Sequence, residues 1–207
     1  MSSWLGVVDL TAGQITLRPL RLDDTRQLAD VVDDPEPYRW TSGVPADVES
    51  ARQWIEKALA DPERRVAYAV VDNATGRLLG TTSFYEIDQA NLSTSIGYTY
   101  YATDAQGTTV NPTAKYLLLR HAFEECGAVR VVWHTHESNA QSRAAIAKLG
   151  ATFEGLLRKH RRHGTGAGAS AATGATTGWR TTAQYAMTDD DWPAARAVLL
   201  GRINGSS

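Results

Sequence analysis

Apolar residues alternate with polar ones early in the chain and then recur at helical spacing. Gln14 to Arg21 alternates, which predicts a strand, and Pro19 confines that strand to an edge or an end of a sheet. Residues 23–32 and 47–59 carry apolar side chains at helical spacing and stop before proline breakers. Three further strands are expected at 66–72, 77–87 and 92–101, the first two joined by a tight turn.

The second half of the chain follows the order strand, glycine turn, helix. A turn at 103–109 precedes an apolar helix at 111–126, where Pro112 occupies the first helical position. Strand 130–135, helix 139–149, strands 152–158 and 182–187, and helix 190–203 are expected after it. This order predicts an α/β fold, a mixed sheet with helices on its faces, in a single domain over residues 1–207.

Residues 164–178 consist only of Gly, Ala, Ser and Thr. Such a segment cannot bury enough apolar surface to offset the entropy lost on ordering. A flexible loop inside a hairpin is therefore expected there.

The composition narrows the range of partners. The formal net charge of -2 gives no general attraction for nucleic acid or for an anionic membrane, and no run of 18 apolar residues occurs. Cys126 is the only cysteine, so an internal disulfide and a cysteine metal cluster are excluded. One cysteine and no recognisable secretory signal suit a cytoplasmic protein, whose partner is expected to be a small molecule or another protein.

The stretch from Gln106 to Asn111 lies between a strand and a helix, so its backbone N–H groups converge as in a phosphate site. A glycine turn that merely ends one element and starts the next is the alternative. The stretch is neither a Walker P-loop nor a Rossmann fingerprint. Lys115 lies one helical turn after Asn111 and can either reach a phosphate or remain a solvated helix lysine.

Several blocks occur in a specific order along the chain: Ile96-Gly97-Tyr98-Thr99, Gly107 to Asn111, Asn139 with Ser142-Arg143, and Glu154-Gly155 with Arg158. With these blocks the chain resembles the GNAT superfamily of N-acetyltransferases, and within it the RimJ and RimL branch. The resemblance implies the GNAT fold over residues 14–187. In that fold the loop before the long helix holds the coenzyme A pyrophosphate, and two central parallel strands splay apart to admit the pantetheine arm.

The resemblance also implies a set of acetyl-CoA contacts. Asn139 would bond the pantetheine or the thioester, and Ser142 would serve near the leaving thiolate because Ile146 stands where many relatives carry a tyrosine. Alternatively, the Ser142 hydroxyl bonds the preceding helical turn. The remaining expected contacts are pyrophosphate-binding amides at Gln106, Gly107, Thr108, Thr109, Val110 and Asn111, and pantetheine pairing at Thr99, Tyr100 and Tyr101.

The implied activity is acetyl transfer from acetyl-CoA to a primary amine in one ternary complex. A general base must accept the ammonium proton, and the candidates are His134, His136, Glu86 and Asp88. The two histidines come first because they share one face of the strand beside the expected splay. No metal is expected, since the histidine pair has no cysteine cluster or spaced carboxylate beside it.

The acceptor amine is either the α-amine of a protein or peptide, or that of a small molecule. Aromatic residues at Tyr38, Trp40, Tyr85 and Trp179 can line its pocket, and the basic run 158–163 can attract an acidic acceptor. Two alternative functions are a binding module that retains coenzyme A without turnover and a nucleotide-dependent enzyme. The protein can also form a homodimer.

Overall fold

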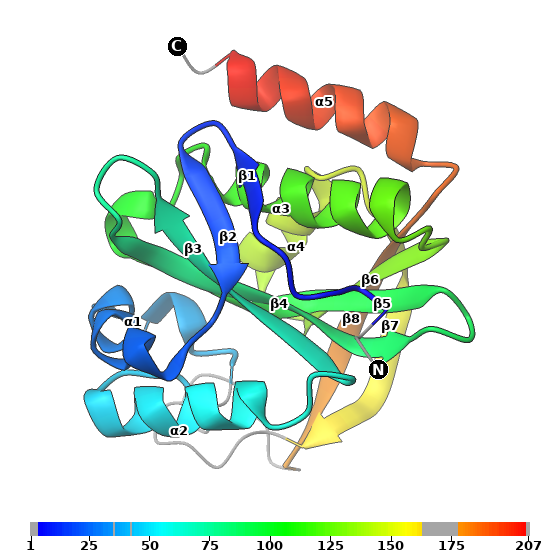
Figure 1. Cartoon of the computed structure of the whole chain (residues 1–207). Helices are drawn as coiled ribbons and strands as arrows, with labels where there is room; N and C mark the ends of the chain where they lie inside the picture. The colour runs from blue at the N-terminus through cyan, green and yellow to red at the C-terminus, as the bar shows by residue number, and fades with distance from the viewer. Residues whose placement is uncertain (1–3, 35, 42, 163–177, 206–207) are drawn as a thin grey trace.

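One eight-stranded sheet runs through the molecule in the order β1-β2-β3-β4-β5-β6-β8-β7 (Figure 1). The structure is a computed structural model that describes residues 4–34, 36–41, 43–162 and 178–205. All neighbouring strands are antiparallel except β5 and β6, which are parallel. The strands are β1 Leu10–Ala12, β2 Ile15–Pro19, β3 Arg65–Asp72, β4 Leu78–Asp88, β5 Ser93–Tyr101, β6 Arg130–His136, β7 Thr152–Arg162 and β8 Trp179–Thr188.

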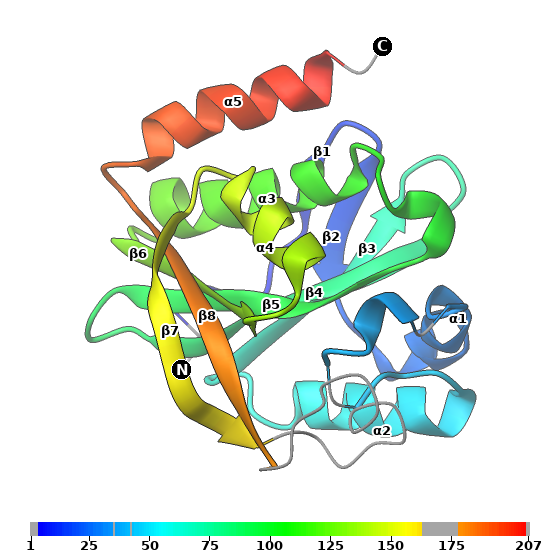
Figure 2. The ribbon, with the colours of Figure 1, turned by 180° about the vertical axis from the view of Figure 1, so that it is seen from behind.

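Among the described residues, five α-helices cover the two faces of the sheet. Helices α1 and α2 lie on one face, and α3, α4 and α5 lie on the other (Figures 1 and 2). Two separate clusters of buried apolar side chains fill the layers beneath these two groups of helices. The helices are α1 Thr25–Val31, α2 Val48–Leu59, α3 Val110–Arg120, α4 Ala140–Ala147 and α5 Trp192–Asn204.

Local sequence explains where α2 begins and which face it buries. The Asp47 carboxylate accepts a hydrogen bond from Ser50 N at 2.8 Å, and Ser50 Oγ accepts one from Asp47 N at 3.0 Å. This reciprocal cap satisfies two N–H groups that the first helical turn leaves without partners. Ala51, Trp54 and Ile55 then place apolar surface against the sheet, as the helical spacing predicts.

The parallel pair at the centre of the sheet is short. Strands β5 and β6 pair only between residues 93–95 and residues 130–132. They then continue to Tyr101 and His136, and in this described part of both strands they no longer pair with each other. The sheet therefore opens between two adjacent strands.

The helices and strands expected from the sequence are present, and the mixed α/β architecture with one parallel pair is confirmed. Strand β1 was not anticipated because it has only three residues. Pro112 occupies the third position of α3, not the first, since the helix already begins at Val110. The missing N–H of Pro112 still falls in the first turn, where it costs no hydrogen bond. The loop expected at 164–178 lies, apart from Gly178, outside the described residues.

Candidate active site

A bulge shapes β5 where the sheet opens. Thr81 and Ser83 lie two positions apart on β4, whereas their partners Tyr100 and Gly97 lie three positions apart on β5. Tyr98 absorbs the extra residue with a left-handed φ of 51°, and its carbonyl accepts a hydrogen bond from Thr81 Oγ1 at 3.2 Å. A bulge of this kind bends the strand and ends regular pairing, so it accounts for the separation of β5 from β6.

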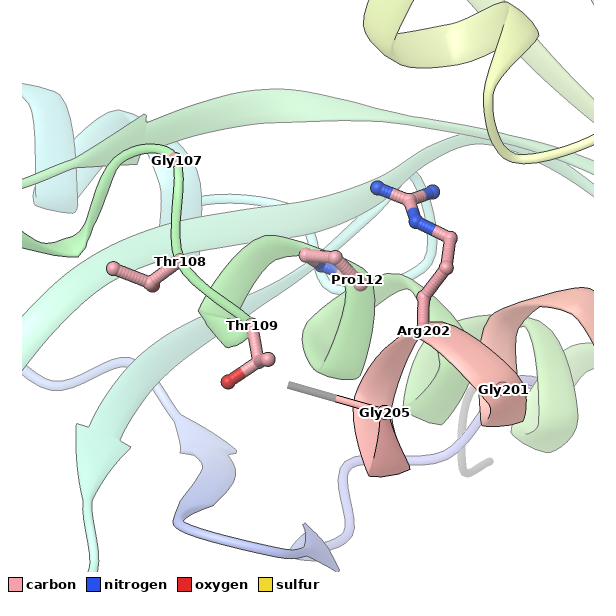
Figure 3. Close-up of a pocket in the computed structure, with 7 residues that line it drawn as sticks. All are labelled: Gly107, Thr108, Thr109, Pro112, Gly201, Arg202 and Gly205. Carbon is pink, nitrogen blue, oxygen red and sulfur yellow. The ribbon is translucent and has the colours of Figure 1, made fainter. Parts of the chain in front are cut away.

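A hollow of about 260 Å³ lies where the glycine turn enters α3 (Figure 3). Gly107 adopts a φ of 73°, and a Cβ there would meet no atom within 4 Å. The left-handed backbone explains the glycine, and the open space leaves the loop amides accessible. The hollow is lined by Gly107, Thr108, Thr109, Pro112, Gly201, Arg202 and Gly205.

The expected pyrophosphate loop divides into two parts. Thr108 Oγ1 donates to Ala105 O at 2.7 Å and accepts from Val110 N at 3.2 Å, so the Val110 amide is already used. The Gln106 side chain turns away and donates to Tyr101 O at 3.1 Å. Residues 107–109 therefore carry the part of the loop that faces the hollow.

Arg202, on the last turn of α5, reaches the same hollow, and its side chain extends past Pro112 in Figure 3. Its Nη1 donates to Lys148 O at 2.9 Å. Sequence reasoning missed this residue because almost 100 positions separate it from Gly107. A guanidinium beside open backbone amides is the combination that binds phosphate.

The side chain of Tyr38 closes one part of the open β5 edge. Its hydroxyl accepts from Tyr101 N at 2.8 Å and donates to Tyr101 O at 2.7 Å. Both backbone groups of Tyr101 that were expected to pair with pantetheine therefore hold Tyr38. The ring of Tyr100 is buried and packs against Tyr38 and Trp54.

Lys115 points into the sheet from α3. Its side chain is buried, and Nζ donates to Thr99 Oγ1 at 2.8 Å and to Thr82 Oγ1 at 2.9 Å. Burial lowers the pKa of Lys115 from 10.5 to about 7. The expected role as a phosphate ligand is thus corrected, as is the solvated alternative: the amine is held beside the bulge by two hydroxyls.

A hydrogen-bonded network surrounds His134 on β6. Gln184 Nε2 donates to Glu154 at 3.0 Å, so Gln184 Oε1 faces His134 Nε2, also at 3.0 Å. This arrangement requires a proton on Nε2 and leaves Nδ1 as the acceptor. Tyr85 Oη lies 3.2 Å from Nδ1, and Glu86 Oε2 lies 3.5 Å from it. The Nδ1 atom of His134 therefore lies between the Tyr85 hydroxyl and the Glu86 carboxylate.

The other candidate bases have different surroundings. The neighbouring His134 and Ser95 side chains, together with the guanidinium of Arg161, lower the pKa of Glu86 to about 2, which makes it a weak base. Asp88 bonds Asn91 in the turn between β4 and β5. The ring of His136 packs on Trp40 at 4.6 Å, and its Nδ1 accepts from Ser138 N.

Asn139 and Ser142 meet at the start of α4. Asn139 Oδ1 accepts a hydrogen bond from Ser142 N at 3.0 Å, as an N-cap residue does. This bond fixes the orientation of the Asn139 side chain. Ile146, one turn later, is buried in the core, which agrees with the absence of a tyrosine at that position.

Within the described ranges, no group of three or more His, Cys, Asp or Glu residues is arranged to hold a metal ion. Nor is any helix in that part of the chain both long enough and apolar enough to cross a membrane.

Residues 14–152 match the family described as the acetyltransferase (GNAT) domain. The match spans well over half of the 207 residues. The chain belongs to the GNAT acetyltransferase family. The splayed pair β5 and β6 and the glycine turn before α3 therefore stand where the family resemblance placed them.

Two relatives support this membership. The chain is 26% identical over 152 residues to the uncharacterized N-acetyltransferase p20 of Bacillus licheniformis, covering 72% of this chain and 85% of the relative. It is 26% identical to a GCN5-related N-acetyltransferase from Brucella melitensis, with a TM-score of 0.80 over 94% of this chain and 85% of that one.

A second solved structure has the same fold. Mycobacterium smegmatis RimJ, solved in complex with CoA-disulfide, is similar with a TM-score of 0.73 over 95% of this chain and 94% of that one, at 23% identity. The likeness to RimJ is one of fold.

Proposed function

We propose that this GNAT acetyltransferase uses acetyl-CoA to acetylate a primary amine by direct transfer in a ternary complex. One observation carries the proposal: β5 and β6 stop pairing after residues 93–95 and 130–132, the chain beyond β5 leads into the Gly107 turn, and β6 carries His134. The two strands of the opening thus connect a place for an anionic tail with a place for a proton.

The residues around the opening fit coenzyme A. The amides of residues 107–109 and the guanidinium of Arg202 would hold phosphate, because they line one accessible hollow. The exposed backbone of β5 near Thr99 would pair with the amides of the pantetheine arm, as an added strand does. Asn139 keeps Nδ2 for the same arm while Oδ1 caps α4.

Bound acetyl-CoA would supply a thioester whose acetyl group moves to the amine as the thiol leaves. His134 would take the ammonium proton at Nδ1, and Glu86 would stabilise the resulting imidazolium from 3.5 Å. Gln184 would keep the ring in the correct tautomer. Ser142 would face the leaving thiol. It would take the part of the tyrosine that many relatives carry at the position of Ile146 in this chain.

The acceptor class has two forms, the α-amine of a protein or peptide and the amine of a small molecule. Thiol release can be measured with peptides that differ in their first residue and with a panel of small amines. Acetyl-CoA-dependent release with at least one acceptor supports the proposal. Its absence across the panel, in folded protein that binds acetyl-CoA, contradicts it.

A second candidate is a coenzyme A-binding module with little turnover. Ile146 in place of a tyrosine and the Tyr38 hydroxyl on the β5 edge favour it. Binding of acetyl-CoA without thiol release would select this candidate.

We also place the protein in the cytoplasm, since a single cysteine suits a reducing compartment. We also propose that the protein forms a homodimer, and light scattering of the purified chain would test this.

A further inference from the structure

Three arginines gather around Tyr85 on the α2 side of the opening. Arg65 on β3 is paired with Tyr85 on β4, and Arg161 on β7 is paired with Arg180 on β8, so the two members of each pair lie on the same face of the sheet. The Cζ atom of Arg161 lies 6.0 Å from the centre of the Tyr85 ring. That ring packs against Tyr98 at 5.1 Å, and the Cζ atom of Arg65 lies 3.8 Å from the Tyr98 ring.

Burial and the neighbouring Arg161 lower the pKa of Arg180, while Tyr85 acts on it in the opposite direction. The charges of Arg161 and Arg180 are therefore close enough to influence each other. The guanidinium of Arg65 is also held in place, because it stacks on both Trp54 and Tyr98. The arginines thus form a fixed, partly desolvated cationic cluster, named here the arginine cluster (Arg65, Arg161 and Arg180).

Donors in the arginine cluster remain unsatisfied. Arg65 Nη2 and Arg161 Nε are buried and have no hydrogen-bond partner among the residues that the structure describes. Arg65 uses Nε for Ser83 Oγ, at 3.1 Å. A buried donor without a partner is costly, and folded proteins contain few of them. Two such donors within one cluster indicate that a hydrogen-bond acceptor belongs there.

The charges of the arginine cluster are also unbalanced. In the described part of the chain, its ion pairs involve one carboxylate, that of Glu86, which contacts Arg161. The same carboxylate lies 3.5 Å from His134. Three guanidinium groups against one carboxylate leave an excess of positive charge, and burial makes such an excess unfavourable without a counter-ion. An anion supplies what the cluster lacks.

We propose that the acceptor amine carries a carboxylate a few bonds away, and that the arginine cluster binds this carboxylate while the amine faces His134. The inference rests on the proposed function and names its substrate class. The planar forks of arginine match a carboxylate with two parallel hydrogen bonds. Tyr85 connects the two places, since its hydroxyl lies at His134 Nδ1 and its ring lies beside Arg161.

Such an acceptor is either a free amino acid or the acidic start of a peptide, and matched acceptors distinguish the two. One pair compares free amino acids with their amides, and the other compares peptides beginning with Asp or Glu with those beginning with Asn or Gln. We expect kcat/KM for thiol release to be about 10- to 100-fold higher for the carboxylate member of one pair. The pair that responds identifies the source of the carboxylate.

Arg180→Gln and Arg161→Gln should bring this ratio close to one without changing the affinity for acetyl-CoA. Arg180→Lys keeps the charge and should retain part of the preference, which separates charge recognition from a general loss of folding. Arg26→Gln is the matched control, because Arg26 is an exposed arginine on α1. The control should leave the ratio unchanged.

Equal rates for both members of each pair would overturn the inference, as would variants that lose both activities in the same proportion. If only uncharged or cationic amines are acetylated, the inference fails while the proposed function stands. If acetyl-CoA binds and no acceptor in the panel releases thiol, both fail.

Discussion

Replacement of Lys115 by methionine tests whether a buried amine beside the β5 bulge sets the pH dependence of stability. Methionine has a similar length and carries no charge. Burial lowers the pKa of Lys115 to about 7 in the folded protein, whereas an unfolded chain returns it to about 10.4. Between these values the unfolded chain binds more protons, so the free energy of unfolding of the wild type rises with pH.

The magnitude follows from the width of that window. Each pH unit inside it contributes about 1.4 kcal/mol. Near pH 7.5 the folded side chain is still partly protonated, so two pH units upward from there add about 2 to 3 kcal/mol. Below a pH of about 7 the amine is protonated in both the folded and the unfolded protein. The full free-energy cost of burying the charged amine then opposes folding. Thr82 and Thr99 keep each other as hydrogen-bond partners at 3.0 Å, so the variant leaves neither hydroxyl alone.

Urea unfolding of the wild type and Lys115→Met at matched pH values measures the difference, in which the contributions of all other groups cancel. We expect the variant to be the more stable of the two at neutral pH and to lose that advantage as the pH rises. Lys57→Met is the control, because Lys57 is an exposed lysine on α2. Parallel curves for the wild type and Lys115→Met would refute the reasoning.

Three further changes test the site. His134→Gln should lower kcat by about 10²- to 10⁴-fold, because the amine loses its base, with part of the loss recovered at high pH and the affinity for acetyl-CoA unchanged; a loss no greater than that of His136→Gln would contradict this. Tyr38→Phe should lower the Kd for acetyl-CoA about tenfold by freeing the backbone N–H of Tyr101, whose carbonyl keeps its hydrogen bond from Gln106; weaker binding in a titration would show that the hydroxyl assists the ligand. Gly107→Val forces a branched residue into a φ of 73°, so the Kd for acetyl-CoA should rise about tenfold. Gly76→Val carries similar strain at a φ of 71° in the β3–β4 turn, and an equal effect there would argue against a role for the Gly107 loop.

Local patterns in the sequence were sufficient to predict the helices and strands and part of the candidate active site. Alternation and helical spacing located the strands and helices, and the order strand, glycine turn, helix located the Gly107 loop, because each pattern spans adjacent residues. His134 and Glu86 were both named as candidate bases, and the structure brings them within 3.5 Å.

Contacts between distant segments could not be anticipated. Arg202 reaches the hollow through the packing of α5, and Gln184 meets His134 only because β6 and β8 pair in that register. The burial of Lys115 had a signal in the sequence, because the apolar run Tyr116 to Leu119 follows it directly. In the structure, every residue from Pro112 to Leu119 of α3 is buried. A lysine inside such an apolar helix points to a buried amine, whereas the position one turn after Asn111 suggested a phosphate contact.

We propose that the Gly107 turn and the opening between β5 and β6 bind acetyl-CoA, and isothermal titration of acetyl-CoA into the folded chain measures this binding. We expect saturable heat at one site per chain, with an affinity that falls about tenfold or more in Arg202→Ala as a charge-assisted contact is lost. Folded protein that gives no saturable heat with acetyl-CoA would contradict it.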